Sequence, residues 1–423
     1  MSPQLSERRL IFLIGSVQFI NVLDFMMVMP LGPDFAHALG IPSSKLGLIG
    51  GIYTLSAACA GIAGAFFLDR FDRRRALAVA LAGLVLGTLA GGFAVGLGSL
   101  LAARMIAGAF GGPATSLSLA IITDAVPPDR RGRAMGAVMG AFSVASVLGV
   151  PAGLELARLG GWRLPFFTVA ALGAVVVASA MAILPPQRAH LLRRAARSSF
   201  RAVLSRPVVR LSLAGTATAV IANFALIPNL SAYFQFNRGY PRAQLGLLYL
   251  VGGAVSFATM RIAGYLADRY GSPAVAAGGS AAFICILMVG FIYPPAWLPV
   301  LPVFVGFMVS GSFRFVPMQA LSSRVPEAPE RARFMSAQSA VQHLASAAGA
   351  MTGAQILAER TDGSLIGMDD LAWFAVATSI ILPGIIYLVD RRVRARELGA
   401  PALAAAAFAA AAIEPAIDGE HVG

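Results

Sequence analysis

The stretch Ala65-Phe-Phe-Leu-Asp-Arg-Phe-Asp-Arg-Arg-Arg75 places six charges among its last seven residues, in a chain that is 57% hydrophobic and 13% charged. Long apolar segments flank this charged turn on both sides. Each is long enough to cross a hydrocarbon core of about 30 Å as a helix. A bilayer offers the backbone no hydrogen-bond partners, so a helix is the expected form of such a segment. The stretch therefore predicts a short charged turn between two membrane-spanning helices.

Similar apolar segments recur along all 423 residues, and the mean hydropathy is +0.76. We predict an all-α integral membrane protein with 12 transmembrane helices. The expected spans are 10–32, 44–68, 76–97, 99–122, 136–157, 164–184, 210–233, 244–267, 274–293, 297–320, 335–358 and 371–389. The first apolar run is too long for a secretory signal and is expected to be retained. Cys59 and Cys285 lie inside apolar runs and are expected to be small buried side chains.

The charged turn has a second copy, Gly264-Tyr-Leu-Ala-Asp-Arg-Tyr-Gly271, in which Asp268 follows Asp69 by 199 residues. A repeat of this length, in the same orientation, predicts two parallel halves of six helices each. We assign the halves to 1–184 and 210–395.

Two further segments complete the predicted organisation. Residues 185–209 join the halves, and their arginines alternate with short apolar groups. This pattern is typical of a basic amphipathic helix on an anionic cytoplasmic leaflet. Residues 396–423 are rich in alanine and are expected to form a cytoplasmic tail with no assigned function.

The distribution of basic residues predicts the orientation. Of the 33 lysines and arginines, 24 fall in loops on the side of both termini, and six fall in loops on the other side. The positive-inside rule then places both termini in the cytoplasm. A net charge of +13 can also indicate a nucleic-acid partner. These charges lie in short loops without an aromatic and basic groove pattern, so we expect no nucleic acid.

With these features the chain resembles the major facilitator superfamily over about residues 8–395. The second charged turn, 264–271, is similar to the motif A of that family, and Arg104-x-x-x-Gly108 is similar to its motif B. Asn21-Val-Leu-Asp24 resembles the acidic signature of proton-driven exporters. Among the branches, the chain is most similar to the drug and sugar efflux group, the arabinose-efflux-like permeases.

A further resemblance lies in the fifth predicted span. The family's motif C, associated with helix packing and antiport, is similar to the residues here, although the proline stands one position later than usual. The matching residues are Gly140, Gly149, Pro151 and Gly153.

The resemblance implies a secondary active transporter of the bacterial inner membrane. It would export a drug, sugar or related metabolite by proton antiport with alternating access. Two alternatives stay open, a proton-coupled uptake symporter and a facilitated-diffusion carrier of a small polar or anionic solute. The sequence contains no P-loop and no hydrolase or metalloprotease motif. We therefore expect no ATP, cofactor, metal or enzymatic activity. The substrate and the oligomeric state are not identified by the sequence.

Asp24 is the leading candidate for proton coupling. It lies past the middle of the first predicted span, where a carboxylate is costly and marks function by default. Arg104, in the fourth span, is expected at a similar depth and is the natural partner. The alternative interpretation is a permanent structural ion pair.

The resemblance also implies a conformational latch at the charged turns. The aspartates would approach helix N-termini of the opposite half, where the helix dipole favours an anion. The alternative is that the arginines only anchor the topology. The residues assigned to the latch are Asp69, Arg70, Arg73, Asp268 and Arg269.

Polar residues inside the predicted spans are candidates for a substrate cavity between the halves. Arg314 is the candidate for contact with an anionic or polar substrate, whereas a lone histidine such as His343 is more often a hydrogen-bonding residue. The full set is Gln18, Asn21, Asn223, Asn229, Tyr233, Arg314, Gln338, Gln342 and His343.

Overall fold

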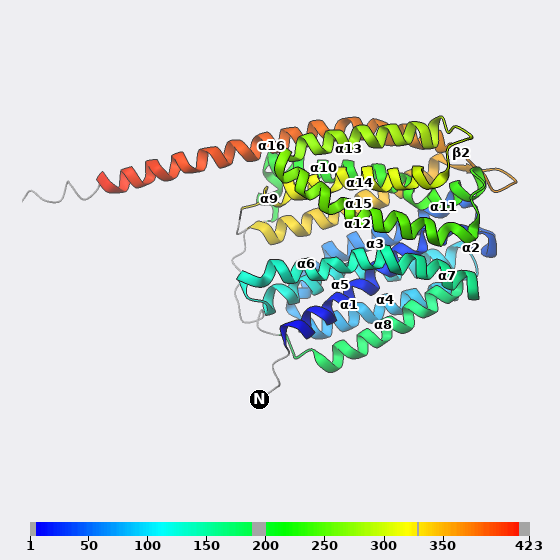
Figure 1. The fold of residues 1–423 in the computed structure, drawn as a ribbon. Coiled ribbons are helices and arrows are strands. Elements are labelled where there is room, and N and C mark those ends of the chain that lie inside the picture. Colours follow the sequence, from blue (N-terminus) through cyan, green and yellow to red (C-terminus); the bar gives the residue numbers. More distant parts are fainter. Residues whose placement is uncertain (1–5, 188–199, 328–329, 414–423) are drawn as a thin grey trace, which may run out of the picture.

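The computed structural model describes residues 6–187, 200–327 and 330–413, and long helices lying side by side make up most of it (Figure 1). The predicted N-terminal half, called the first half below, contains α1 (Glu7–Val28), α2 (Gly32–Leu39), α3 (Leu46–Phe67), α4 (Arg73–Gly92), α5 (Leu97–Ala125), α6 (Pro128–Val144), α7 (Val150–Gly160) and α8 (Arg163–Ile183). The second half contains α9 (Phe200–Ser205), α10 (Pro207–Leu226), α11 (Leu230–Ala232), α12 (Leu245–Tyr270), α13 (Ser272–Leu287), α14 (Val300–Ser323), α15 (Arg331–Ile356) and α16 (Met368–Ile413).

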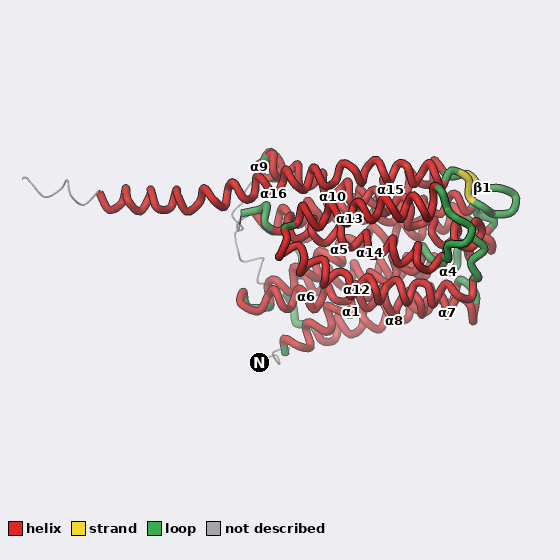
Figure 2. Tube along the Cα trace, turned by 45° about the horizontal axis from the view of Figure 1, so that its top comes forward, coloured by secondary structure: helices red, strands yellow, loops and turns green. Residues whose placement is uncertain are grey.

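Shorter elements connect or extend these helices. The π-helix η3 (Ala145–Gly149) joins α6 to α7, and η6 (Tyr233–Asn237) follows α11. The two short strands, β1 (Ala358–Glu359) and β2 (Leu365–Ile366), pair antiparallel in the loop before α16 (Figure 2).

The described residues contain 11 helical stretches that are long and apolar enough to cross a membrane. The remaining predicted span, 335–358, corresponds to α15, which has 26 residues. Its polar side chains, among them Gln338, Gln342 and His343, lower its hydropathy. The predicted all-α membrane class is therefore confirmed, and the chain is a multi-pass membrane protein.

The outer face of the bundle is apolar, because lipid is its solvent. Large hydrophobic side chains on spanning helices, such as Phe12 and Ile380, are mostly exposed. The prediction that Cys59 and Cys285 are buried was wrong, since both are exposed. An apolar sequence environment does not separate a side chain in the core from one that faces lipid.

The chain starts and leaves the bundle at the same end (Figure 1). We call this the arginine-rich end, and the opposite one the far end. About half of the predicted basic linker, residues 188–199, lies outside the described residues, and α9 and the start of α10 are its described helical parts. At the C-terminus α16 continues past the bundle to Ile413, well beyond the predicted span end at residue 389. The last residues of the predicted tail, 414–423, also lie outside the described residues.

The two halves pack closely along two helix pairs. Helix α3 lies against α15, and α12 lies against η3 and α7. Gly51 and Gly253 permit these approaches: a β-carbon on Gly51 would lie 3.1 Å from Met351, and one on Gly253 would lie 3.0 Å from the Ser146 carbonyl oxygen. Small residues allow this kind of close helix packing in membranes.

At the far end, a bidentate ion pair joins the halves. The Nε and Nη2 atoms of Arg242 donate to the two carboxylate oxygens of Asp34, at 2.7 and 2.6 Å. Lys45 donates to the Ala354 carbonyl oxygen at 3.3 Å, and the Ser43 amide donates to Glu359. We call the Arg242–Asp34 pair the far-end clamp.

Breaking the clamp is expected to favour conformations that are open at the far end. We predict that Asp34→Asn lengthens the distance between spin labels at positions 37 and 360, which are exposed and belong to different halves. The labels go on cysteines in a Cys59→Ser, Cys285→Ser background, and pulsed electron paramagnetic resonance gives the distance distribution.

The matched control is Glu7→Gln, which removes a partly exposed ion pair with Arg130 within the first half. This control should leave the distances unchanged. Equal distance distributions in Asp34→Asn and the unmodified clamp would show that the pair does not hold the far end.

Candidate functional site

A buried ion pair lies inside the first half, between α1 and α5. Arg104 Nη1 and Nη2 donate to Asp24 Oδ1 and Oδ2 at 2.9 and 3.0 Å. The side chains are 1% and 0% exposed. Thr88 of α4 donates to Asp24 Oδ1 at 2.6 Å, so the carboxylate joins three helices. The predicted pairing of Asp24 with Arg104 is therefore present.

A second layer of polar contacts surrounds this pair. The Arg104 guanidinium lies 4.6 Å above the ring of Tyr53, whose hydroxyl donates to Asn21 Oδ1 at 2.9 Å. Asn21 in turn donates to the Gly111 carbonyl oxygen at 2.9 Å and to Thr115 at 2.6 Å. Every polar group of Asn21 is thus used in holding α1 to α3 and α5.

The motif B glycine makes this geometry possible. A β-carbon on Gly108 would collide with the backbone of Tyr53. Without a side chain at this position, α5 approaches α3 closely enough for the Tyr53 ring to cover Arg104.

Such a pair has a definite chemistry. Protonating Asp24 would leave the Arg104 cation buried without its counter-ion, which is strongly unfavourable. A change of charge at either side chain would therefore disturb the packing of α1, α4 and α5, which the pair joins.

The motif C residues pack against the helix that carries Asp24. A β-carbon on Gly149 would lie 2.6 Å from Leu23, and one on Gly153 would lie 3.6 Å from Met27. The π-helix η3 ends two residues before Pro151, where the missing backbone N–H interrupts the regular helix ladder. Gly140 has no such neighbour within 4 Å. Two of the three predicted glycines therefore contact α1 beside the acid.

In the second half, Arg314 of α14 is completely buried. Its Nη1 donates to Asn223 Oδ1 of α10 at 3.3 Å, and its guanidinium lies 4.2 Å from the ring of Phe283. No ion pair of Arg314 is found in the described part of the chain.

Two other predicted cavity residues make hydrogen bonds inside the second half, and the bond of Tyr233 joins separate helical segments. Tyr233 donates to the Gly290 carbonyl oxygen at 3.0 Å, and Asn229 donates to the Ala225 carbonyl oxygen at 3.4 Å. Both side chains are buried.

The other predicted cavity residues lie on α1 and α15. Gln338 donates to Gln319 of α14. Gln18 Oε1 and Gln342 Nε2 are buried atoms that have no hydrogen-bond partner among the described residues. His343 is half-buried.

An aromatic stack connects the two polar sites. Phe25, next to Asp24, stacks on Tyr53 at 5.1 Å and on Phe224 at 6.1 Å. Phe224 is the neighbour of Asn223. The chain segments that carry Asp24 and Asn223 therefore meet at the contact between the halves.

The latch residues have mixed surroundings. The side chain of Asp69 lies outside the described residues, and Arg70 and Asp268 are exposed. Arg73 donates to Asp124 and to the Ala120 carbonyl oxygen within its own half, and Arg269 donates to Tyr265 at 3.2 Å. The latch stays a prediction.

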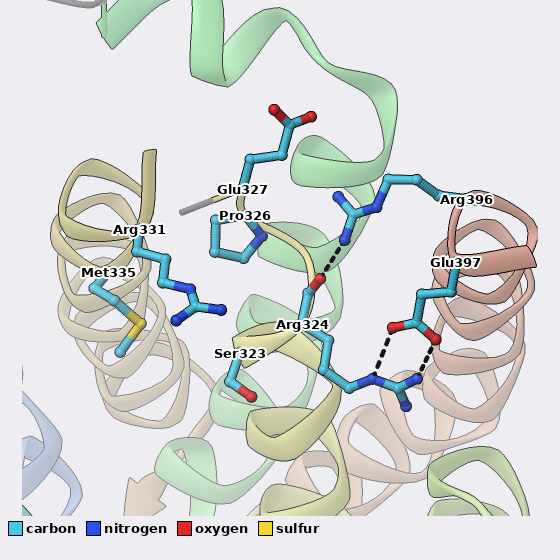
Figure 3. Close-up of a pocket in the computed structure, with 8 residues that line it drawn as sticks. All are labelled: Ser323, Arg324, Pro326, Glu327, Arg331, Met335, Arg396 and Glu397. Atoms are coloured by element: carbon cyan, nitrogen blue, oxygen red, sulfur yellow. Dashed lines mark hydrogen bonds and ion pairs between the residues drawn. The ribbon is translucent and has the colours of Figure 1, made fainter. Parts of the chain in front are cut away.

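A pocket of about 580 Å³ lies at the arginine-rich end, between the loop after α14, the start of α15, and α16 (Figure 3). Arg324 Nε and Nη2 bind the carboxylate of Glu397 there at 3.3 and 2.6 Å. A pocket of about 370 Å³ at the far end includes Asp34. Neither pocket is lined by the predicted cavity residues.

The sequence interpretation missed Thr88, Tyr53, Thr115 and Gln319. One signal was available, because Thr88 is the only residue with a polar side chain in the predicted span 76–97.

We predict that Asp24→Asn lowers the thermal unfolding temperature. The variant leaves the buried Arg104 cation without its counter-ion, which lowers the free energy of unfolding by about 3–5 kcal/mol. The double variant Asp24→Asn, Arg104→Gln should recover part of the loss, because it removes the unpaired charge. Scanning fluorimetry of the detergent-solubilised protein measures both. Thr88→Val is the smaller control, with a loss of about 1 kcal/mol. A double variant no more stable than Asp24→Asn would argue against a buried charge as the cause.

Comparisons with known proteins agree with this architecture. The family model of the Major Facilitator Superfamily matches residues 14–350. The chain is 28% identical over 285 residues to a chloramphenicol resistance protein of Streptomyces lividans, covering 63% of this chain and 67% of that protein. It is 27% identical over 259 residues to the purine ribonucleoside efflux pump NepI of Escherichia coli O157:H7, covering 60% of this chain and 63% of the pump. The chain thus spans about two thirds of the length of these curated relatives.

Among solved structures, a bacterial homologue of the human lysosomal transporter Spinster has a TM-score of 0.73 at 17% identity. The match covers 92% of this chain and 98% of that one, and at this identity it speaks for the fold. With the family match across most of the helical bundle, these findings show that the chain belongs to the major facilitator superfamily, a family of membrane transporters and not of enzymes.

Proposed function

We propose that this protein exports a small organic molecule across the bacterial inner membrane in exchange for protons, with both termini in the cytoplasm. The observation that carries the proposal is the buried Asp24–Arg104 pair at the junction of α1, α4 and α5. A titratable carboxyl group inside a membrane bundle is a functional site by default. The names of two relatives, a resistance protein and an efflux pump, support export.

The proposed cycle uses the two halves, 1–184 and 210–395, as rocking bodies. When the far end opens, the Arg242–Asp34 clamp breaks and Asp24 takes up a proton from the periplasm. Protonation releases Arg104 from its ion pair and allows α1 to shift against α5. Closing the far end and opening the arginine-rich end returns the proton to the cytoplasm, and the ion pair forms again as the next substrate binds.

The remaining assignments follow from this cycle. Asp69 and Asp268, with the arginines beside them, would close the arginine-rich end when the far end is open. Gly149 and Gly153 would form the surface on which α1 moves, because both pack on that helix.

The test uses everted membrane vesicles that hold a pH-sensitive dye and are energised to acidify the lumen. A panel of amphenicols, nucleosides, sugars and organic acids is added to wild type and to Asp24→Asn. We expect lumenal alkalinisation by one class of compound in wild type and none in Asp24→Asn, because the variant has no titratable group at the site.

Glu155→Gln is the matched control, since it removes a carboxylate that lies half-exposed near the far end. It should behave as wild type. Alkalinisation of equal size in Asp24→Asn would remove Asp24 from the coupling role. Movement of a radiolabelled compound without any proton gradient, and with no accumulation when one is applied, would identify a facilitated-diffusion carrier instead.

A further inference from the structure

The second half contains a polar pair between the same two spanning helices as the first half, with a neutral amide in place of the acid and with the arginine 210 residues, not 199, after Arg104. The interval of 199 residues that relates Asp69 to Asp268 also relates Asp24 to Asn223. Asn223 Oδ1 accepts a hydrogen bond from Arg314 on α14, as Asp24 accepts from Arg104 on α5. Each half therefore links its first spanning helix to its fourth through an arginine. In the second half the acid is replaced by an amide.

The replacement leaves a positive charge without a counter-ion. Asn223 is neutral, and Arg314 is completely buried. The described acids of the second half lie in loops, near helix ends, or on α16 beyond the predicted span end at residue 389: Asp268, Glu327, Glu330, Glu359, Asp362, Asp369, Asp370, Asp390 and Glu397. The Phe283 ring at 4.2 Å supplies only a cation–π contact. A buried charge of this kind is normally neutralised by an anion.

The donors that Arg314 leaves unused form one edge of the guanidinium group. Its Nε and Nη2 atoms have no hydrogen-bond partner among the described residues. Arg242 uses the same two atoms to hold both oxygens of Asp34, and Arg324 uses them to hold Glu397. This edge fits a planar carboxylate with two parallel hydrogen bonds.

The site also borders the contact between the halves. Asn223 and Phe224 are half-buried, and Phe224 stacks on Phe25 of the other half at 6.1 Å. The side chain of Asn223 lies against Gly311, which is one helical turn before Arg314. A β-carbon on Gly311 would lie 3.7 Å from the amide nitrogen of Asn223. A rearrangement of the halves therefore changes the surroundings of this arginine directly.

We propose that Arg314, oriented by Asn223, binds the carboxylate of an organic anion that the protein transports. This deepens the proposed function and rests on it for the transport step, whereas carboxylate binding can be tested alone. The two halves then divide the charges, with the proton on the Asp24–Arg104 pair and the substrate anion on Arg314.

The experiment measures the thermal unfolding of the full-length chain in detergent at neutral pH. The probe is sodium benzoate at constant sodium and chloride concentration, and benzamide is its neutral isostere. We expect benzoate, and not benzamide, to raise the unfolding temperature of wild type. Arg314→Gln should lose this response, with binding weakened by about tenfold or more.

Asn223→Asp is the decisive second variant, because it supplies an internal counter-ion. We expect it to unfold at a higher temperature than wild type without benzoate and to respond no further to benzoate. It keeps the proposal testable if Arg314→Gln fails to fold. Arg261→Gln is the matched control: it removes another arginine of a spanning helix, one that is exposed and lies over Phe257, and should keep the benzoate response.

Three results would overturn the inference: no benzoate response in wild type, an equal response to benzamide, or an unchanged benzoate response in Asn223→Asp. These are separable from failure of the proposed function. Benzoate binding without proton flux in vesicles would leave the anion site and remove antiport. Proton antiport of neutral compounds without benzoate binding would leave the proposed antiport and remove the anion site.

Discussion

The ion pair between Asp24 and Arg104 is the contact around which the first half is built. Both side chains are excluded from solvent, so each is acceptable inside the bundle only because the other is present. The close approach of α5 to α3 at Gly108, the Tyr53 ring over the guanidinium, and the hydroxyl of Thr88 all hold this pair in one geometry. Packing of Gly149 on α1 ties the fifth span to the same site. A change of charge at this pair would therefore disturb the packing of five helical segments, α1, α3, α4, α5 and η3.

The internal repeat gives the two halves a common plan and different electrostatics. The first half contains a balanced pair, and the second half contains Arg314 beside a neutral amide. Equivalent positions in a repeated bundle can hold different residues. The change from Asp24 to Asn223 at one such position would give the two halves different functions. The stack of Phe25 on Phe224 places these two positions on either side of one contact.

Much of the fold was predictable from the sequence, because lipid imposes a strict length and polarity on each spanning helix. The doubled charged turn and the 12 spans follow from that rule, and so does the pairing of Asp24 with Arg104, the charged residues deepest in the first half. The far-end clamp did not follow, since Asp34 and Arg242 lie outside the predicted spans and in different halves. Cys59 was predicted to be buried and is exposed. The sequence cannot distinguish the core-facing side of such a helix from the lipid-facing side, because both are apolar. The bond between Asn223 and Arg314 depends on helix rotation, which spacing alone does not determine.

The far-end clamp has one more consequence, which follows from its partial exposure. The side chains of Arg242 and Asp34 are 27% and 23% exposed, whereas the Asp24–Arg104 pair is sealed. Mobile ions weaken attraction between accessible charges, and the screening length falls from about 30 Å at 0.01 M salt to about 10 Å at 0.1 M. In the proposed cycle, the salt concentration of the compartment outside the far end would therefore affect the balance between conformations, while the inner pair would be insulated from it. At low ionic strength the clamp would therefore close the far end more firmly than at high ionic strength.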